Sequence, residues 1–211
     1  MYILDVLLFA SVIFMHLAKK STAVISLYVG QSLIVAFLLF FSAFRDRSLS
    51  LAFVALVVFT VKVIVAPYFL RRLVFKHQLK FTASTYLNGP LTLIVLALIT
   101  AFTFSDFLKP LSVISGANGN LLPLATAMML ISVFLIINRK GALSQMIGIL
   151  SLENSIVFFA FLAGLDEAPS LELGIIFDIL IWIIIATVFA GSVYREFGTL
   201  DVNEMKHLKE E

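Results

Sequence analysis

The sequence contains no cysteine. This absence excludes disulfide bonds, thiolate-bound iron–sulfur clusters, c-type haem attachment and cysteine-ligated zinc. Histidine is scarce as well, and of the three histidines only His16 lies inside an apolar run. A haem held between two histidines within a membrane is therefore not expected, and His16 is expected at a membrane interface near a helix end. The chain is predicted to hold no metal and no cofactor of its own.

Charged residues are also few, at 13% of 211 residues, or about half the share found in soluble proteins. Hydrophobic residues make up 61% of the chain, and the mean hydropathy is +1.08. A soluble domain is about 45–50% apolar, so one core of this size could not enclose the excess. Much of the apolar surface is therefore predicted to face lipid.

Seven apolar runs are long enough for membrane-spanning helices, which need about 20 residues each. The first run follows an N-terminus without basic residues, so we expect a span rather than a signal peptide. The fold class is therefore all-α, a polytopic membrane protein with about seven transmembrane helices. The predicted spans cover residues 3–18, 21–44, 49–70, 90–107, 121–137, 142–165 and 171–194.

The loops between these runs differ sharply in basic charge. Eleven of the 15 Lys and Arg residues fall in the first, third and fifth loops and in the C-terminal tail, against three in the other loops. Basic loops stay in the cytoplasm. The sequence therefore predicts an N-terminus outside, a C-terminus inside, and a cytoplasmic tail over residues 196–211.

Three ionisable residues lie well inside predicted spans: Lys62, Glu153 and Asp178. Inserting each at a helix centre costs about 2.5–3.5 kcal/mol. Their neighbours at three, four and seven residues, which share their helix face, offer no polar partner. A partner must then come from another helix, another subunit or water. Charged groups in such surroundings can exchange protons near neutral pH, because their charged forms are poorly solvated.

Two structural interpretations stand beside this one. Glu153 or Asp178 could pair with a basic residue of a neighbouring subunit and serve assembly alone. Lys62 could extend its ammonium to the membrane surface, although Arg71 lies about 13 Å along the helix, which strains that path. The two carboxylates sit at different depths on antiparallel helices, an offset that suits a relay through one or two waters better than one shared site.

Smaller polar features have structural interpretations. Ser144, Gly148, Ser151 and Ser155 recur at helical spacing, and such small residues allow helices to pack closely. Gln31 is expected to make a helix–helix hydrogen bond and Pro67 to kink the third span. Asp5 is expected at the interface.

The last third of the chain carries recognisable motifs. Residues 148–154 read GILSLEN, which resembles the segment around the buried glutamate of the small K subunit of complex I and of the C subunit of multisubunit cation/proton antiporters. Residues 172–178 read ELGIIFD and residues 198–203 read GTLDVN, as in component E of hydrogenase-4. Lys62 and Pro67 resemble a lysine-then-proline element of that family. The component E resemblance covers nearly the whole chain, and the K-subunit resemblance covers residues 121–195.

The resemblance implies a chain in three parts. Residues 1–120 would form an N-terminal four-helix membrane region, residues 121–195 a K-subunit-like three-helix region, and residues 196–211 the tail. By position, Glu153 matches the first membrane glutamate of the K subunit. Asp178 falls near the second, with aspartate in place of glutamate.

The implied function is that of a non-redox subunit in the membrane arm of a group 4 membrane-bound nickel–iron hydrogenase or a related complex I-like assembly, in a prokaryotic cytoplasmic (inner) membrane. Its partners would be antiporter-like membrane subunits and a cytoplasmic hydrogenase-type electron-transfer module. Glu153, Asp178 and Lys62 would carry or tune protons, or Na⁺ in their place. A free-standing secondary transporter and a structural spacer between larger subunits remain the alternatives.

Overall fold

The computed structural model describes residues 2–76, 84–113 and 121–163, together with residues 180, 183–184, 187–188, 191 and 194–195. Within these residues every regular element is a helix, and an isolated antiparallel bridge joins Thr85 to Arg139. The predicted all-α class is therefore confirmed for the part of the chain that can be described. The seventh predicted span and the tail lie largely outside it.

The helices follow the predicted apolar runs closely. Asn88 caps α5 by accepting a hydrogen bond from the Leu91 amide, and Pro90 lies in the first turn. The elements are α1 (Tyr2–Leu17), α2 (Ser21–Arg45), α3 (Leu49–Val58), a π-helix (Phe59–Val65), α4 (Ala66–Lys76), α5 (Gly89–Thr103), a 3₁₀ helix (Asp106–Val113), α6 (Leu122–Asn138) and α7 (Ala142–Leu162).

The fourth run differs from its prediction. The sequence predicted a span to residue 107, but α5 ends at Thr103, and Phe104 leaves the helical conformation. A 3₁₀ helix then covers Asp106–Val113 and includes Pro110, where a loop had been expected. Proline lacks an amide proton, and the short 3₁₀ turns accommodate it where a long α-helix would not.

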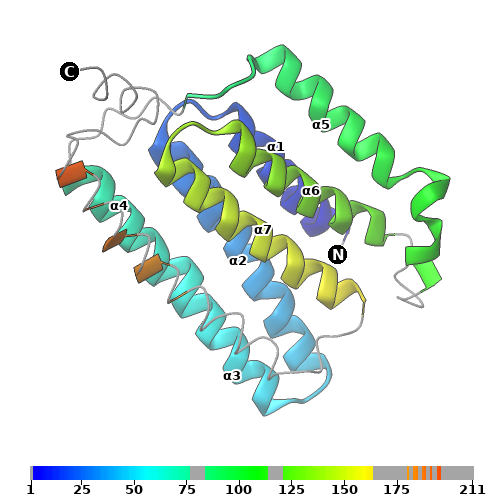
Figure 1. The fold of residues 1–211 in the computed structure, drawn as a ribbon. Helices are drawn as coiled ribbons and strands as arrows, with labels where there is room; N and C mark the ends of the chain where they lie inside the picture. Colours follow the sequence, from blue (N-terminus) through cyan, green and yellow to red (C-terminus); the bar gives the residue numbers. More distant parts are fainter. Residues whose placement is uncertain are drawn as a thin grey trace, which may run out of the picture.

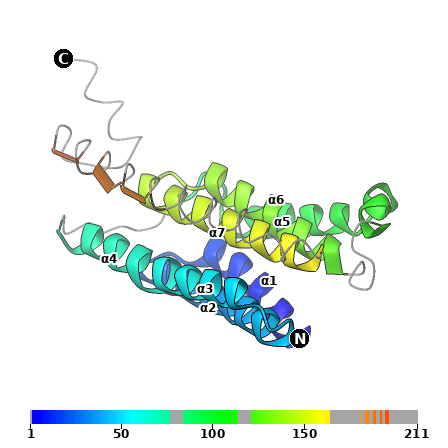
Figure 2. The ribbon, with the colours of Figure 1, turned by 90° about the horizontal axis from the view of Figure 1, so that it is seen from below.

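The helices lie in two layers (Figure 2). One layer holds α1, α2 and the long segment from α3 to α4, and the other holds α5, α6 and α7 (Figure 1). Between the layers α7 packs on α2, and α6 packs on α1. The buried apolar core lies mainly along these two contacts. Polar groups that reach this inner plane are consequently shielded by both layers.

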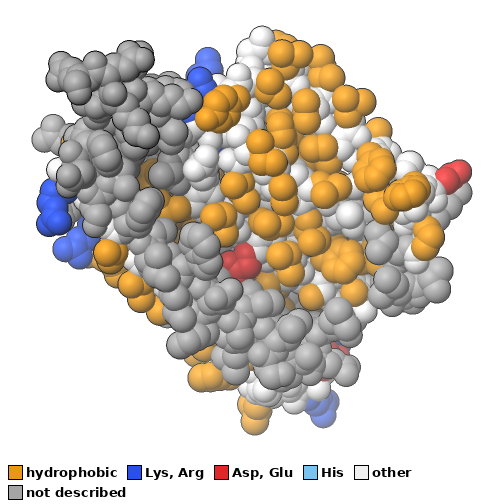
Figure 3. Space-filling model, viewed as in Figure 1, with side chains coloured by type: hydrophobic (Ala, Val, Ile, Leu, Met, Phe, Trp, Pro, Cys, Tyr) orange, Lys and Arg blue, Asp and Glu red, His pale blue; other side chains and the backbone are white. Residues whose placement is uncertain are grey.

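Among the described residues, three helical segments are long and apolar enough to cross a membrane: Ser21–Arg45, Leu49–Arg72 and Leu143–Leu162. Three shorter apolar helices accompany them: Ile3–Leu17, Gly89–Thr103 and Leu122–Asn138. Their outward side chains are largely hydrophobic, and Figure 3 shows such side chains over most of the described surface of one face, with basic side chains at its margins. This surface is that of a multi-pass membrane protein.

The third span is continuous but not uniform. Between α3 and α4 the chain forms a π-helix, and the Ala66 amide bonds to the carbonyl of Val61, five residues back. Pro67 follows directly, and a proline ring clashes with the carbonyl four residues before it. The wide π turn removes that clash, so the irregularity predicted at Pro67 takes the form of a π segment, with Lys62 at its centre.

Arg139 ties three loops together at one end of the bundle. Its Nη2 donates to the carbonyls of Met15, His16 and Ala18 at the end of α1, the last at 2.9 Å. Its backbone also pairs with Thr85 in the loop before α5. A cation placed on the free carbonyls of a helix C-terminus is favourable. The first, third and fifth loops, predicted to be cytoplasmic, therefore meet at one end.

The same end corrects an expectation for His16. Rather than lying at an interface, the side chain is buried: Nε2 lies 3.0 Å from the Ile131 carbonyl of α6, and the ring stacks on Phe134. Asp5, also expected at the interface, is buried near the start of α1. Both helix ends pack against neighbours, which the apolar run alone could not indicate.

The stripe of small residues on α7 packs on α6, as expected. Ser132 of α6 lies 3.1 Å from the hydroxyl of Ser151 and 3.3 Å from that of Ser155. A Cβ added to Gly148 would lie 2.8 Å from Cγ1 of Ile136 and 3.2 Å from its backbone nitrogen. The contact of α6 with α7 is thus too close for any larger side chain at Gly148.

Candidate functional site

A buried ion pair joins the two layers. Lys62, at the centre of the π segment, extends its Nζ to 3.4 Å from Oε1 of Glu153 on α7. The Lys62 side chain is only 1% exposed and that of Glu153 13%. The lysine therefore does not extend to the membrane surface, and that alternative for Lys62 is wrong. Each residue finds in another helix of the same chain the partner that its own helix face lacks.

Asn154 extends this pair into a network. Lys62 Nζ donates to its Oδ1 at 3.1 Å. Its Nδ2 donates in turn to Ser32 Oγ at 2.9 Å and to Gln31 Oε1 at 3.4 Å, both on α2. The expected helix–helix hydrogen bond of Gln31 is thereby confirmed. Through this one amide, the π segment, α2 and α7 are held at the same level.

Glu153 and Asn154 are adjacent on α7, and their side chains have different surroundings. Adjacent residues on an α-helix point about 100° apart. Asn154 therefore faces α2 and is completely buried, while Glu153 lies toward the edge of the helix pair and keeps some exposure. A buried ion pair needs further hydrogen bonds to offset its loss of hydration. Asn154 supplies one of them by accepting a hydrogen bond from Lys62, while the Glu153 side chain stays 13% exposed.

Two more polar side chains of α2 border the network. Tyr28 is fully buried one turn before Ser32, close enough to Glu153 for an electrostatic interaction. Nε2 of Gln31 is buried and has no hydrogen-bond partner among the residues that the structure describes. Burying a polar group without a partner is costly, so this amide marks a place where the network is open to a further acceptor, such as water.

Of the three predicted site residues, the structure brings Lys62 and Glu153 together, and Asp178 lies outside the described residues. Asn154, Ser32 and Tyr28 were not predicted. The signal for Asn154 was its place directly after Glu153 in the Leu-Glu-Asn motif. Nothing in the sequence pattern distinguished Ser32 or Tyr28 from other polar residues in apolar runs.

The described ranges contain no cluster of three or more His, Asp or Glu side chains that could hold a metal ion. A carboxyl group such as that of Glu153 has the chemistry to take up and release a proton, and an ammonium beside it stabilises the ionised form. The side chains of Gln31 and Ser32 on α2 hydrogen-bond Asn154, which in turn accepts from Lys62.

Known proteins share sequence similarity with this chain. The family NADH-ubiquinone/plastoquinone oxidoreductase chain 4L matches residues 120–210. Hydrogenase-4 component E of Escherichia coli K12 is 32% identical over 127 residues, which are 58% of this chain and 57% of that protein. The chain is thus similar to hydrogenase-4 component E, and its C-terminal part is similar to chain 4L.

Proteins of other bacteria are similar to the chain as well. An uncharacterized protein of Mycobacterium tuberculosis is 28% identical over 89% of this chain and 86% of its own length. Component E of Shigella flexneri matches as the K12 protein does, and the chain spans somewhat more than half the length of these component E relatives. No solved structure matches the chain.

The ion pair joins a residue inside the chain 4L match, Glu153, to a residue outside it, Lys62. Residues 120–210 include α6, α7, Glu153 and Asn154, whereas Lys62 and the α2 side chains lie before that stretch. The carboxylate thus belongs to the chain 4L-like part. Its counter-ion and the hydrogen bonds to Asn154 come from the preceding helices.

Proposed function

We propose that this chain is a membrane subunit of a complex I-like membrane-bound hydrogenase, and that it conducts protons through Glu153. The observation that carries the proposal is the ion pair of Lys62 with Glu153, 3.4 Å apart, within two candidate membrane spans. The similarity to hydrogenase-4 component E and the chain 4L match support the kind of complex.

The proposed mechanism has two states. With Glu153 ionised, the carboxylate pairs with Lys62, as the structure has it. When a proton binds to Glu153 the ion pair is lost, and Lys62 retains its hydrogen bond to Asn154. The ammonium then opposes the positive charge that has arrived and favours its release. A change of charge in a neighbouring subunit would select between the states, so gating is electrostatic.

Asp178 is proposed as the next carrier, and Na⁺ as the ion in place of H⁺ remains within the same proposal. The chain needs no cofactor for this role. It would lie in a prokaryotic cytoplasmic membrane with its C-terminus inside, since its basic loops meet at one end of the bundle. Antiporter-like membrane subunits and a cytoplasmic hydrogenase-type module would be its partners.

A pull-down of the tagged chain from its native membrane in mild detergent tests the complex. Mass spectrometry of all co-purifying proteins should recover antiporter-like subunits together with a cysteine-rich electron-transfer module. Recovery of the chain alone would overturn membership of a complex. Ion transport by the purified chain alone in liposomes would then identify a secondary transporter.

Substitution of the carboxylates separates conduction from a spacer role. Glu153→Gln and Asp178→Asn should abolish or strongly reduce transport while the pull-down recovers the same partners. If either substitution instead disrupts assembly, or leaves transport at the wild-type rate, the chain acts as a spacer at that position.

A further inference from the structure

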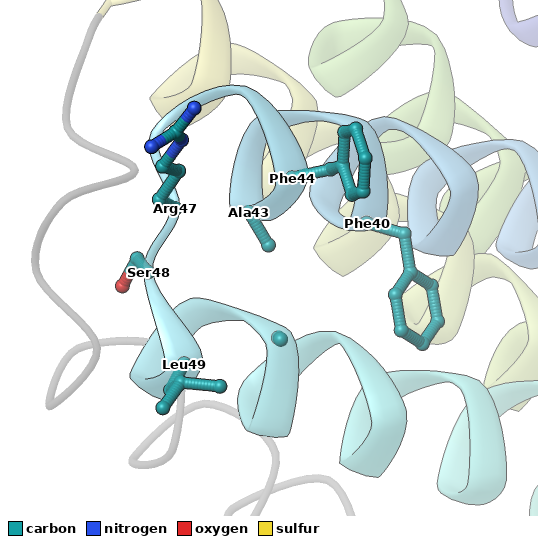
Figure 4. Close-up of a pocket in the computed structure, with 7 residues that line it drawn as sticks. Phe40, Ala43, Phe44, Arg47, Ser48 and Leu49 are labelled. Carbon is teal, nitrogen blue, oxygen red and sulfur yellow. The ribbon is translucent and has the colours of Figure 1, made fainter.

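A groove lies between the end of α2 and the start of α3, at the end of the bundle opposite Arg139. Its volume is about 470 Å³. Apolar side chains dominate its lining: Phe40 and Phe44 come from α2, and Leu49 from the first turn of α3 (Figure 4). The small side chains of Ala43 and Ala52 leave the space between the helices open.

The groove is open to the surroundings of the molecule. Phe44 and Leu49 are each 88% exposed. Both flanking segments, Ser21–Arg45 and Leu49–Arg72, are candidate membrane spans, so their connection lies at the boundary between hydrocarbon and water. An apolar groove at this level faces acyl chains along its length and headgroups at its end.

The two arginines beside the groove differ in their charge balance. Arg45 makes a two-point contact with Asp46, at 2.9 Å for Nε to Oδ1 and 3.1 Å for Nη2 to Oδ2, so its charge is compensated. Arg47, which lines the groove, has no hydrogen-bond or ion-pair partner within the described ranges. Among the residues that the structure describes, the charge of Arg47 is therefore the uncompensated one at the groove.

A second polar group lies next to it. Ser48 caps α3 by accepting a hydrogen bond from the Leu51 amide at 3.2 Å. That leaves its hydroxyl proton available to an acceptor, since a hydroxyl both donates and accepts. A guanidinium and a hydroxyl proton together present donors that suit a phosphate oxygen.

We propose that this groove binds an anionic phospholipid, with one acyl chain along Phe40, Phe44 and Leu49 and its phosphate on Arg47 and Ser48. The combination of an apolar groove with one uncompensated cation at headgroup level selects such a lipid over a zwitterionic one. A bound lipid would brace α2, which carries Gln31 and Ser32, against the segment that carries Lys62. This inference does not depend on the proposed function.

Photolabelling tests the proposal. The chain, purified from its native membrane with its partners, is reconstituted in phosphatidylcholine vesicles that contain a trace of photoreactive phosphatidylglycerol or of phosphatidylcholine with the same reactive acyl chain. Mass spectrometry then locates the labelled peptide. We expect residues 40–52 to be labelled about fivefold more by the phosphatidylglycerol probe, the factor that one basic residue near the surface supplies.

Variants in one turn of the chain provide matched controls. Arg47 has a backbone φ of 51°, so Arg47→Asn removes the charge with a residue that tolerates this conformation. This substitution should abolish the preference between the probes, whereas Arg47→Lys, which keeps the charge, should preserve it. Ala52→Trp should fill the groove and lower labelling by both probes.

Two results would overturn the proposal. One is equal labelling of residues 40–52 by the two probes in the wild type. The other is a photoreactive residue at Leu49 that crosslinks to a neighbouring subunit rather than to lipid, which would make the groove a protein–protein contact.

Discussion

Nζ of Lys62 lies 3.4 Å from Oε1 of Glu153, and Oδ1 of Asn154 accepts a hydrogen bond from the same nitrogen at 3.1 Å. The Lys62 ammonium thus contacts both an ionisable carboxylate, that of Glu153, and a neutral amide oxygen, that of Asn154. Protonation of Glu153 removes one of these contacts and leaves the other. Glu153 could therefore bind and release a proton while the hydrogen bond to Asn154 keeps Lys62 in position.

The ion pair predicts a specific non-additivity. Lys62→Met leaves the Glu153 carboxylate without this counter-ion, and breaking a buried pair costs about 3–5 kcal/mol. Adding Glu153→Gln removes the remaining charge, so the double variant should be more stable than Lys62→Met alone. Thermal unfolding in detergent measures this. Strictly additive effects of the two substitutions would show that the pair is not coupled in the membrane.

Asn154 is predicted to matter for both stability and transport. Asn154→Leu removes hydrogen bonds to Lys62, Ser32 and Gln31, and leaving such buried groups unpaired costs about 1–3 kcal/mol. Transport should fall at least tenfold. The control is Ser155→Ala, also fully buried on α7 but hydrogen-bonded toward α6, which should leave transport unchanged. Equal loss of transport in both variants would contradict a role for Asn154 in holding Lys62.

The close contact of α6 with α7 predicts opposite effects for two glycine substitutions. Gly148→Ala forces a Cβ against Ile136, including its backbone, and should destabilise the chain by about 1–3 kcal/mol. Gly30→Ala on α2 meets no atom within 4 Å and should be neutral or stabilise by about 0.5–1 kcal/mol. Unfolding midpoints of the two variants decide this. A Gly148→Ala protein as stable as wild type would show that α6 and α7 can separate at little cost.

Arg139 is predicted to hold the loop end of the bundle. Arg139→Met removes its contacts with the carbonyls that end α1, and each hydrogen bond to a charged group is worth about 1.5–3 kcal/mol. Arg139→Lys should also destabilise, because a single ammonium cannot reproduce the planar guanidinium. Lys19→Gln, exposed at the same end, should change stability by less than about 0.5 kcal/mol. Protease sensitivity of residues 17–21 would report the release of α1.

The positions of six apolar helices could largely be predicted from the sequence, because lipid demands long apolar helices and because basic residues such as Arg45 and Arg139 lie at their ends. The need of Lys62 and Glu153 for a partner on another helix was equally predictable. Their pairing with each other was not, since it depends on how α7 packs against α2 and the π segment, which no local pattern encodes. The motifs indicated the resemblance to component E and the K subunit, and the comparisons find similarity to hydrogenase-4 component E and to chain 4L.

The burial of Arg139 could not be predicted for a related reason. A pair of basic residues after an apolar run is typical of a solvated helix end, yet Arg139 is buried while Lys140 lies over the Tyr86 ring. Which of two adjacent cations turns inward depends on the carbonyls that a neighbouring helix offers. Asp178 lies outside the described residues, so its role stays a prediction.

The central claim is that Glu153 carries the proton. The direct measurement is electron-transfer-driven proton uptake by the purified complex in proteoliposomes, with wild type and Glu153→Gln compared at equal recovery of all subunits. Gln retains an oxygen that can accept from Lys62, so the account predicts an assembled complex whose electron transfer is no longer coupled to proton uptake through this chain. Proton uptake at the wild-type rate per electron in Glu153→Gln would contradict it.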